Sequence, residues 1–180
     1  MRGLYRWAPA PDGPTKRATI LFSGSAQGAA HAAVTELAEH YDVGAELWSA
    51  TSYKALRDEA LATERWNRLH PNENARLALV TSLLAEGEGP VVAVTDFMKI
   101  VPDQISRFVP HRSFIPLGTD GFGRSDTREA LRRHFEIDMP HVVVAVLSGL
   151  VDSGDVKPEV VADAIARFGL DPESLDPRFA

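Results

Sequence analysis

The 180-residue chain is long enough for one domain with a full hydrophobic core. Its formal net charge of −6 argues against sequence-independent binding of nucleic acid, and the lack of cysteine excludes disulfides, thiolate nucleophiles and cysteine-ligated metals. No segment approaches the ~20 apolar residues of a membrane span, and the N-terminus lacks the apolar core of a secretory signal. We therefore expect a cytoplasmic protein that binds neither nucleic acid nor membranes.

A proline-rich segment precedes the first expected element. Residues 1–16 hold Pro9, Pro11 and Pro14 and are expected to form an extended arm or linker, with the domain proper at residues 17–180. From residue 18 on, short apolar runs alternate with stretches of helical spacing. The first half of this pattern predicts a strand at 18–25, a helix at 26–41, a strand at 43–52 and helices at 53–69 and 75–85.

The second half of the chain continues the alternation. Pro116 interrupts the hydrogen-bond ladder of its strand and indicates a sheet edge or a bulge. The apolar run that starts at Pro140 is too long for a strand and is followed by Gly154, which favours a helix. The pattern predicts strands at 91–97 and 113–120, a short helix at 102–109, and helices ending near residue 135 and spanning 140–153 and 158–169. Such alternation is typical of an α/β sandwich around a mostly parallel sheet.

The stretch "LGTDGFGRSDTREALRRHF" at 117–135 is a glycine-rich turn that leads into an arginine-rich helix, with Ser125 or Asp126 as its N-cap. One interpretation is an anion site, because free N–H groups and the positive end of the helix dipole lie near a row of arginines. The favoured one is a capped surface helix whose arginines pair with carboxylates of this chain or of a neighbouring subunit. The candidate residues are Gly123, Arg124, Ser125, Arg128 and Arg132.

The turn "FSGSAQG" at 22–28 also joins a strand to a helix, through Gly24 and Ser25, as phosphate-binding turns of α/β sheets do. It lacks G-x-G-x-x-G, the P-loop lysine and the glycine that a nucleophile elbow has two positions before its serine. A serine N-cap with a glycine for close packing is therefore favoured. A hydrolase built on Ser25 is the least favoured alternative.

Other polar groups give weaker signals. Asp96 and Asp120 follow strands at the edge where α/β proteins bind ligands, although aspartates there equally cap loops. Trp66 is expected to fill a gap between helices or subunits. No pair of histidines has metal-ligand spacing, which predicts surface or helix-end positions for most of them and no metal site. The histidines are His31, His40, His70, His111, His134 and His141.

Several longer motifs, spread in order over nearly the whole chain, resemble one known family. They include "WSATSY" at 48–53, "ERWNRLHP" at 64–71, "TDFMK" at 95–99 and "VVADAIARFGLD" at 160–171. The most specific is "LGTDGFGRSDTREALRRHFEID" at 117–138. The sequence is similar to the C-terminal domain of the homodimeric type of pyruvate dehydrogenase E1 component, a thiamine-diphosphate enzyme of the transketolase superfamily.

This resemblance implies a three-layer α/β/α fold with a mixed, five-stranded sheet that contributes to dimer packing. The residue patterns yield four strands, so a fifth is expected at 111–120 or in the arm before residue 18. In this family, thiamine diphosphate and Mg²⁺ lie between domains that precede this one. The resemblance therefore implies no catalytic, cofactor-binding or metal-binding residue in this chain.

The resemblance also implies partners: the remainder of the E1 chain, a second E1 subunit and the E2 acetyltransferase. The parent enzyme decarboxylates pyruvate and reductively acetylates the lipoyl groups of E2, linking glycolysis to acetyl-CoA, whereas this domain alone is expected to be inactive and to serve assembly. The alternatives are a regulatory anion- or nucleotide-binding module and the same domain of a related 2-oxo acid dehydrogenase.

Overall fold

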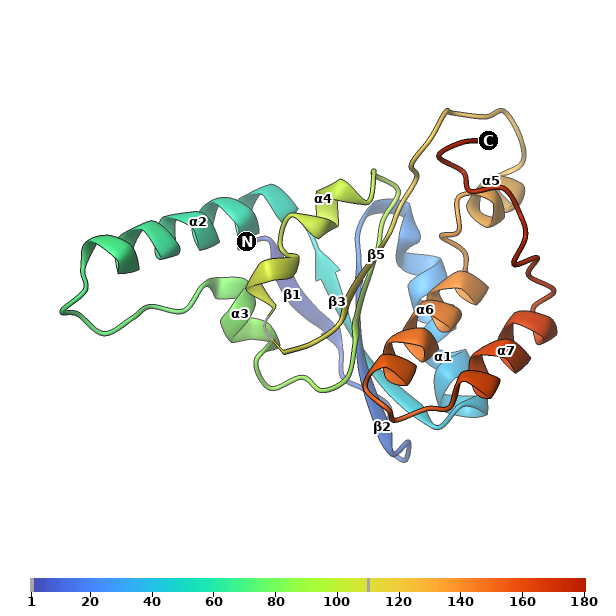
Figure 1. Ribbon diagram of the computed structural model, residues 1–180, viewed down its shortest axis with the longest axis horizontal. Helices are drawn as coiled ribbons and strands as arrows, with labels where there is room; N and C mark the ends of the chain where they lie inside the picture. Colours follow the sequence, from blue (N-terminus) through green and yellow to red (C-terminus); the bar gives the residue numbers. More distant parts are fainter. Residues whose placement is uncertain (1, 110) are drawn as a thin grey trace.

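A five-stranded sheet runs through the centre of the molecule (Figure 1), with the strand order β1-β3-β2-β4-β5. The computed structural model describes residues 2–109 and 111–180. Four strands are parallel, and β1 pairs antiparallel with β3 at one edge. The strands are β1 (Leu4–Ala8), β2 (Lys16–Phe22), β3 (Val43–Ala50), β4 (Val91–Val94) and β5 (Phe114–Leu117). The expected mixed, mostly parallel sheet is confirmed.

The strand that the residue patterns missed is β1. The register sets Leu4 opposite Ala50 and Arg6 opposite Trp48, with a bulge between Arg6 and Ala8. It lies in the arm before residue 18, one of the two places where the fifth strand was expected, so residues 4–8 of the arm expected at 1–16 belong to the sheet. The five-residue run LYRWA has only one fully buried side chain, Leu4, so its hydrophobic pattern is too weak to predict a strand.

Helices cover both faces of the sheet and make three layers. The alternation of side chains along each strand divides the core in two: Ile20 and Val92 face one helical layer, while Leu21 and Val91 face the other. The first layer holds α1 (Gln27–His40), α6 (Met139–Asp152) and α7 (Pro158–Arg167). The second holds α2 (Tyr53–Leu69), α3 (Leu79–Leu84), α4 (Ile100–Asp103) and the 3₁₀ turn η2 (Ser106–Phe108).

The far end of α2 and the loop at 70–78 project from the body of the molecule (Figure 1). A helix was expected at 75–85, but α3 begins only at Leu79. The reason is a side chain of α2: Asn67 accepts a hydrogen bond from the Arg76 amide and donates one to its carbonyl, both at 2.9 Å. These bonds hold Arg76 outside the helix.

Two further boundaries also differ from expectation. The strand predicted at 18–25 ends at Phe22, and the 3₁₀ turn η1 (Gly24–Ala26) follows it. The N-cap of α5 (Arg128–His134) is Thr127, whose hydroxyl accepts from the Ala130 amide at 3.2 Å, rather than Ser125 or Asp126. Pro116 does lie on an edge strand, as predicted.

The apolar helix α6 packs against the sheet with seven buried residues. By length and composition alone, the stretch Arg128–Asp152 is apolar enough to cross a membrane. The structure divides it into α5 and α6 at Glu136, whose φ of 58° lies in the left-handed region. The apolar residues of α6 are apolar because they pack in the core of the domain.

Candidate interface at the carboxyl ends of the strands

The polar residues that the sequence singled out gather where the parallel strands end. We call this region the carboxyl edge; it comprises residues 23–26, 95–100 and 118–123, which follow β2, β4 and β5. In Figure 1 it lies near α4 and α5, at the top of the view. The carboxyl ends of parallel strands meet at one edge of a sheet, so these loops lie together although the sequence separates them.

The turn after β2 is closed by a carboxylate from the end of β4. The Ser25 amide donates to Asp96 Oδ2 at 3.1 Å. Gly24 has a φ of +56°, and a Cβ there would lie 2.4 Å from Asp96 Oδ1. A phosphate bound at this turn would have to displace a negative charge that is already in place. The geometry favours the capping interpretation of Gly24 and Ser25.

Two further contacts fix the loops after β4 and β5. The Thr119 hydroxyl donates to the backbone carbonyl of Asp96 at 3.0 Å, and the Lys99 amide lies 3.3 Å from both carboxylate oxygens of Asp120. Beneath them, the buried hydroxyls of Ser23 and Thr95 are 2.6 Å apart. Asp96 and Asp120 therefore act as loop caps. Asp96 Oδ1 is buried and has no partner among the residues that the structure describes.

The arginine row divides into an internal and an exposed part. Arg132 Nη2 donates to the Ser25 carbonyl at 3.0 Å and so ties α5 to the turn after β2. Arg124 and Arg128 are exposed, and within residues 2–109 and 111–180 neither makes an ion pair. The structure thus brings together Gly24, Ser25 and Arg132, while Gly123, Arg124, Ser125 and Arg128 lie on the surface.

The C-terminal tail completes the carboxyl edge, which the sequence did not indicate. Pro177 is buried, and a Cβ on Gly121 would lie 2.1 Å from its carbonyl oxygen. Arg178 forms a 2.6 Å ion pair with Asp176, which lowers the pKa of that carboxyl to about 2, chiefly through its hydrogen bonds with Arg178. The tail therefore crosses the loop at 118–123 directly.

Most of the histidines lie on the surface or at helix ends, as predicted. Asp138 caps α6 through the amide of His141 and also contacts its ring, at 2.5 Å from Nδ1. His70 stacks on Trp66 at 4.3 Å between ring centroids. Among the described residues, no group of three or more histidine or acidic side chains is placed to hold a metal ion.

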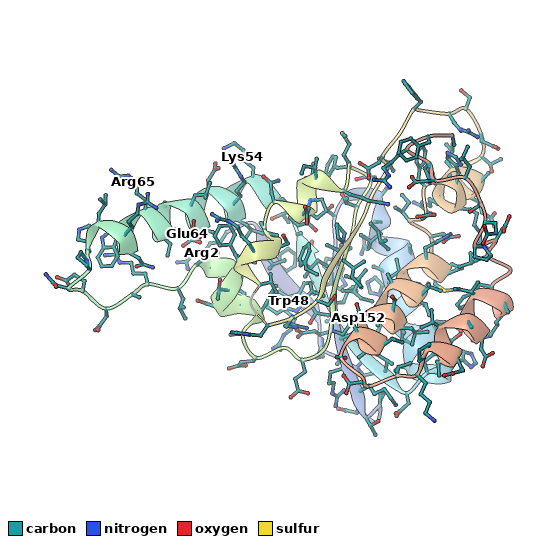
Figure 2. The ribbon with its side chains drawn as sticks, viewed as in Figure 1. Arg2, Trp48, Lys54, Glu64, Arg65 and Asp152 are labelled. Atoms are coloured by element: carbon teal, nitrogen blue, oxygen red, sulfur yellow. The ribbon has the colours of Figure 1, made fainter. Side chains whose placement is uncertain are left out.

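Trp66 lies on the projecting arm, defined as residues 64–78. Its ring contacts His70 and also the Arg76 guanidinium, 3.5 Å from the ring centroid. Figure 2 shows Arg65 on this part of α2, away from the sheet. Trp66 thus holds the arm together, and within the chain it fills the gap between α2 and the following loop.

A second, partly buried polar cluster at the opposite edge was missed by the sequence analysis. Arg112 donates to the carbonyls of Glu88 and Gly89, both at 2.7 Å, and to the Thr19 hydroxyl at 2.6 Å. Burial lowers the pKa of its guanidinium, while the charges of Glu46 and Glu88 raise it. Arg112 lies 93 residues from Thr19 in sequence, so no local motif could have found the cluster.

Comparisons with known proteins agree with this architecture. Residues 3–138 match the family model of the transketolase-like TK C-terminal domain. Solved structures with a similar fold include a split-gene transketolase, described as an inactive beta4 tetramer, with 19% identity, a TM-score of 0.54 and coverage of 84% of this chain and 43% of that one. Transketolase from Leishmania mexicana has 18% identity and a TM-score of 0.53, with coverage of 88% and 20%. The chain belongs to the transketolase-like C-terminal domain family.

Curated relatives of the chain include pyruvate dehydrogenase E1 components. The Mycolicibacterium smegmatis protein is 46% identical over 95% of this chain and 18% of its own length. Those of Pseudomonas aeruginosa and Escherichia coli K12 are 42% and 41% identical over 98% and 99% of this chain, and 20% of theirs. The chain thus spans about a fifth of the length of these relatives.

The residues at the carboxyl edge do not fit a bound diphosphate. The turn that precedes α1, at the end of β2, has its Ser25 amide bonded to the Asp96 carboxylate. A metal-bound diphosphate would face that fixed negative charge without a basic side chain from the turn itself.

Proposed function

We propose that this chain is the C-terminal domain of a pyruvate dehydrogenase E1 enzyme and that it serves assembly rather than catalysis. The full-length enzyme would be a cytoplasmic homodimer that decarboxylates pyruvate with thiamine diphosphate and Mg²⁺ and acetylates the lipoyl groups of E2. Both cofactors would be held by the other domains.

One observation carries the proposal: identity of 41% to 46% to E1 components over at least 95% of the chain, against only 18% to 20% of their length. The fold agrees with it, because the polar groups at the carboxyl edge bond one another rather than face an open cavity. Ser25, Asp96 and Arg132 form one such connected set. In a set of this kind the side chains and backbone groups that bond one another position the loops.

The candidate residues then have two roles. Gly24, Ser25 and Arg132 fix the turn after β2 against α5. The exposed residues Gly123, Arg124, Ser125 and Arg128 would contact the remainder of the E1 chain or the second subunit. In this assignment the loop at 123–128 makes the contact, and the turn at 24–25 supports it through Arg132.

A chimera tests the assignment. The 180-residue sequence would replace the matching fifth of the E. coli E1 component, and pyruvate-dependent ferricyanide reduction would be measured with saturating thiamine diphosphate and Mg²⁺. We expect a dimeric chimera with activity within about tenfold of the parent. A parent truncated before this domain is the control, with loss of the dimer expected because the domain supplies interface area.

Titration of thiamine diphosphate with Mg²⁺ into the 180-residue chain separates assembly from binding. We expect no heat of binding. A one-site isotherm would contradict the assembly assignment, and a salt-sensitive isotherm with phosphate or nucleotide instead would favour a regulatory anion site.

A further inference from the structure

Large apolar side chains are exposed together at the carboxyl edge. Phe122 is 82% exposed, Phe179 74% and Ile100 62%, and Phe97 and Met98 are also more than half exposed. Single exposed apolar residues are normal on protein surfaces, but a group of five is not explained by chance exposure. They are distinct from the core, because none of them belongs to either buried cluster.

These side chains come from three segments that touch one another. The Thr119 amide bonds to the carbonyl of Phe97 at 2.9 Å, joining the loop after β4 to the loop after β5. The backbone of Pro177 lies against Gly121, which joins the C-terminal tail to the same loop. Five exposed apolar residues thus lie on three segments in contact, and we call them together the apolar edge: Phe97, Met98, Ile100, Phe122 and Phe179.

The backbone under the apolar edge is held in place rather than free. Gly118 and Gly121 are packed so closely that a Cβ would lie 2.4 Å from the Phe97 carbonyl oxygen and 2.1 Å from that of Pro177. The Asp120 carboxylate caps Lys99 across the two loops. A fixed backbone with exposed aromatic side chains is pre-organised for binding, because ordering costs little when a partner arrives.

The start of the chain lies at the same edge of the sheet. Leu4, the first residue of β1, pairs with Ala50, the last residue of β3, and the carbonyl of Gly3 accepts from the amides of Thr51 and Ser52. The strand order places β4 and β5 three and four strands from β1, which is about 14 and 19 Å at the usual spacing. A domain joined to residue 2 therefore lies within reach of the apolar edge.

We propose that the apolar edge is the docking surface for the preceding part of the same polypeptide. This inference rests on the proposed function, since relatives five times as long supply the segment that would cover it. Tethering at β1 favours that segment over a second copy, because it raises the local concentration of the covering surface. The exposed Arg124 lies two residues after Phe122 and would form part of the polar rim.

Hydrogen exchange in two contexts tests the inference. Amide exchange would be followed at residues 97–100 and 121–123, in the 180-residue chain and in the E. coli chimera. We expect exchange at least about tenfold slower in the chimera, since docking covers these loops. Phe97→Ser combined with Phe122→Ser is expected to abolish the slowing in the chimera, while changing the thermal midpoint of the 180-residue chain by less than about 2 °C.

Leu77→Ser is the matched control, because Leu77 is 67% exposed but lies on the projecting arm. We expect it to leave the slowing intact. An active chimera with unchanged exchange would overturn the docking inference and leave the proposed function standing, whereas an inactive, monomeric chimera would count against the proposed function itself. Self-association of the 180-residue chain that Phe122→Ser abolishes would make a second copy the occupant and overturn the inference.

Discussion

Arg112→Met removes the charged centre of the cluster at the amino ends of the strands while keeping a long apolar stem. Arg112 bonds the carbonyls of Leu84, Glu88 and Gly89 and the Thr19 hydroxyl, and it faces Glu46 and Glu88. Removing one partner of a buried charged network typically costs about 3 to 5 kcal/mol. Because Arg112 is only partly buried, we expect Arg112→Met to lower the free energy of unfolding by about 3 kcal/mol, the lower end of this range.

For a domain of this size, 3 kcal/mol lowers the thermal midpoint by about 6 to 12 °C. Urea unfolding followed by circular dichroism gives the free energy directly. The control is Arg107→Met, which breaks an exposed ion pair with Glu64 and is expected to cost less than about 1 kcal/mol. A loss below about 1 kcal/mol for Arg112→Met would refute the assignment of this cluster as a structural support.

Three further substitutions probe other parts of the fold. Tyr53→Phe should change the free energy of urea unfolding by less than about 1 kcal/mol, because the buried Tyr53 hydroxyl has no hydrogen-bond partner among the described residues. Gly89→Ala should lower the thermal midpoint by several degrees, about 2 kcal/mol or more, since φ is +66° and the new Cβ would lie 1.8 Å from the Arg17 carbonyl oxygen. Hydrogen bonds from Thr15 hold the pKa of Asp42 at about 2, below its ordinary 3.8, so its stabilisation is complete above pH 4 and is lost as pH falls toward 2. Asp42→Asn should be less stable at pH 7 and lose less stability in acid titrations of unfolding.

Local pattern predicted most of the secondary structure. The helix at 140–153 lies within one residue of α6, because an apolar run bounded by Pro140 and Gly154 has few alternatives. The helix expected at 75–85 failed at its start, because the Asn67 side chain takes the backbone bonds of Arg76. That contact joins the end of one helix to a loop nine residues away, and periodicity carries no information about it.

The candidate site was predicted in its parts and not in its arrangement. The sequence indicated Ser25, Asp96 and the arginine helix separately, and left capping and ligand binding open for Asp96. In the fold Asp96 caps the turn after β2. The parallel strands bring the ends of β2 and β4 side by side, so that the Asp96 carboxylate accepts a hydrogen bond from the Ser25 amide.

The sequence alone determined the α/β class, the polar character of the turns and, through its long motifs, the resemblance to a family. These properties depend on neighbouring residues, whose spacing along the chain is fixed by covalent geometry. The tertiary structure alone decided which of the two expected places holds the fifth strand, that the tail at Pro177 crosses the loop at Gly121, and that Arg112 reaches Thr19. Those contacts join residues far apart in the chain, and they exist only because the sheet brings its distant strands together.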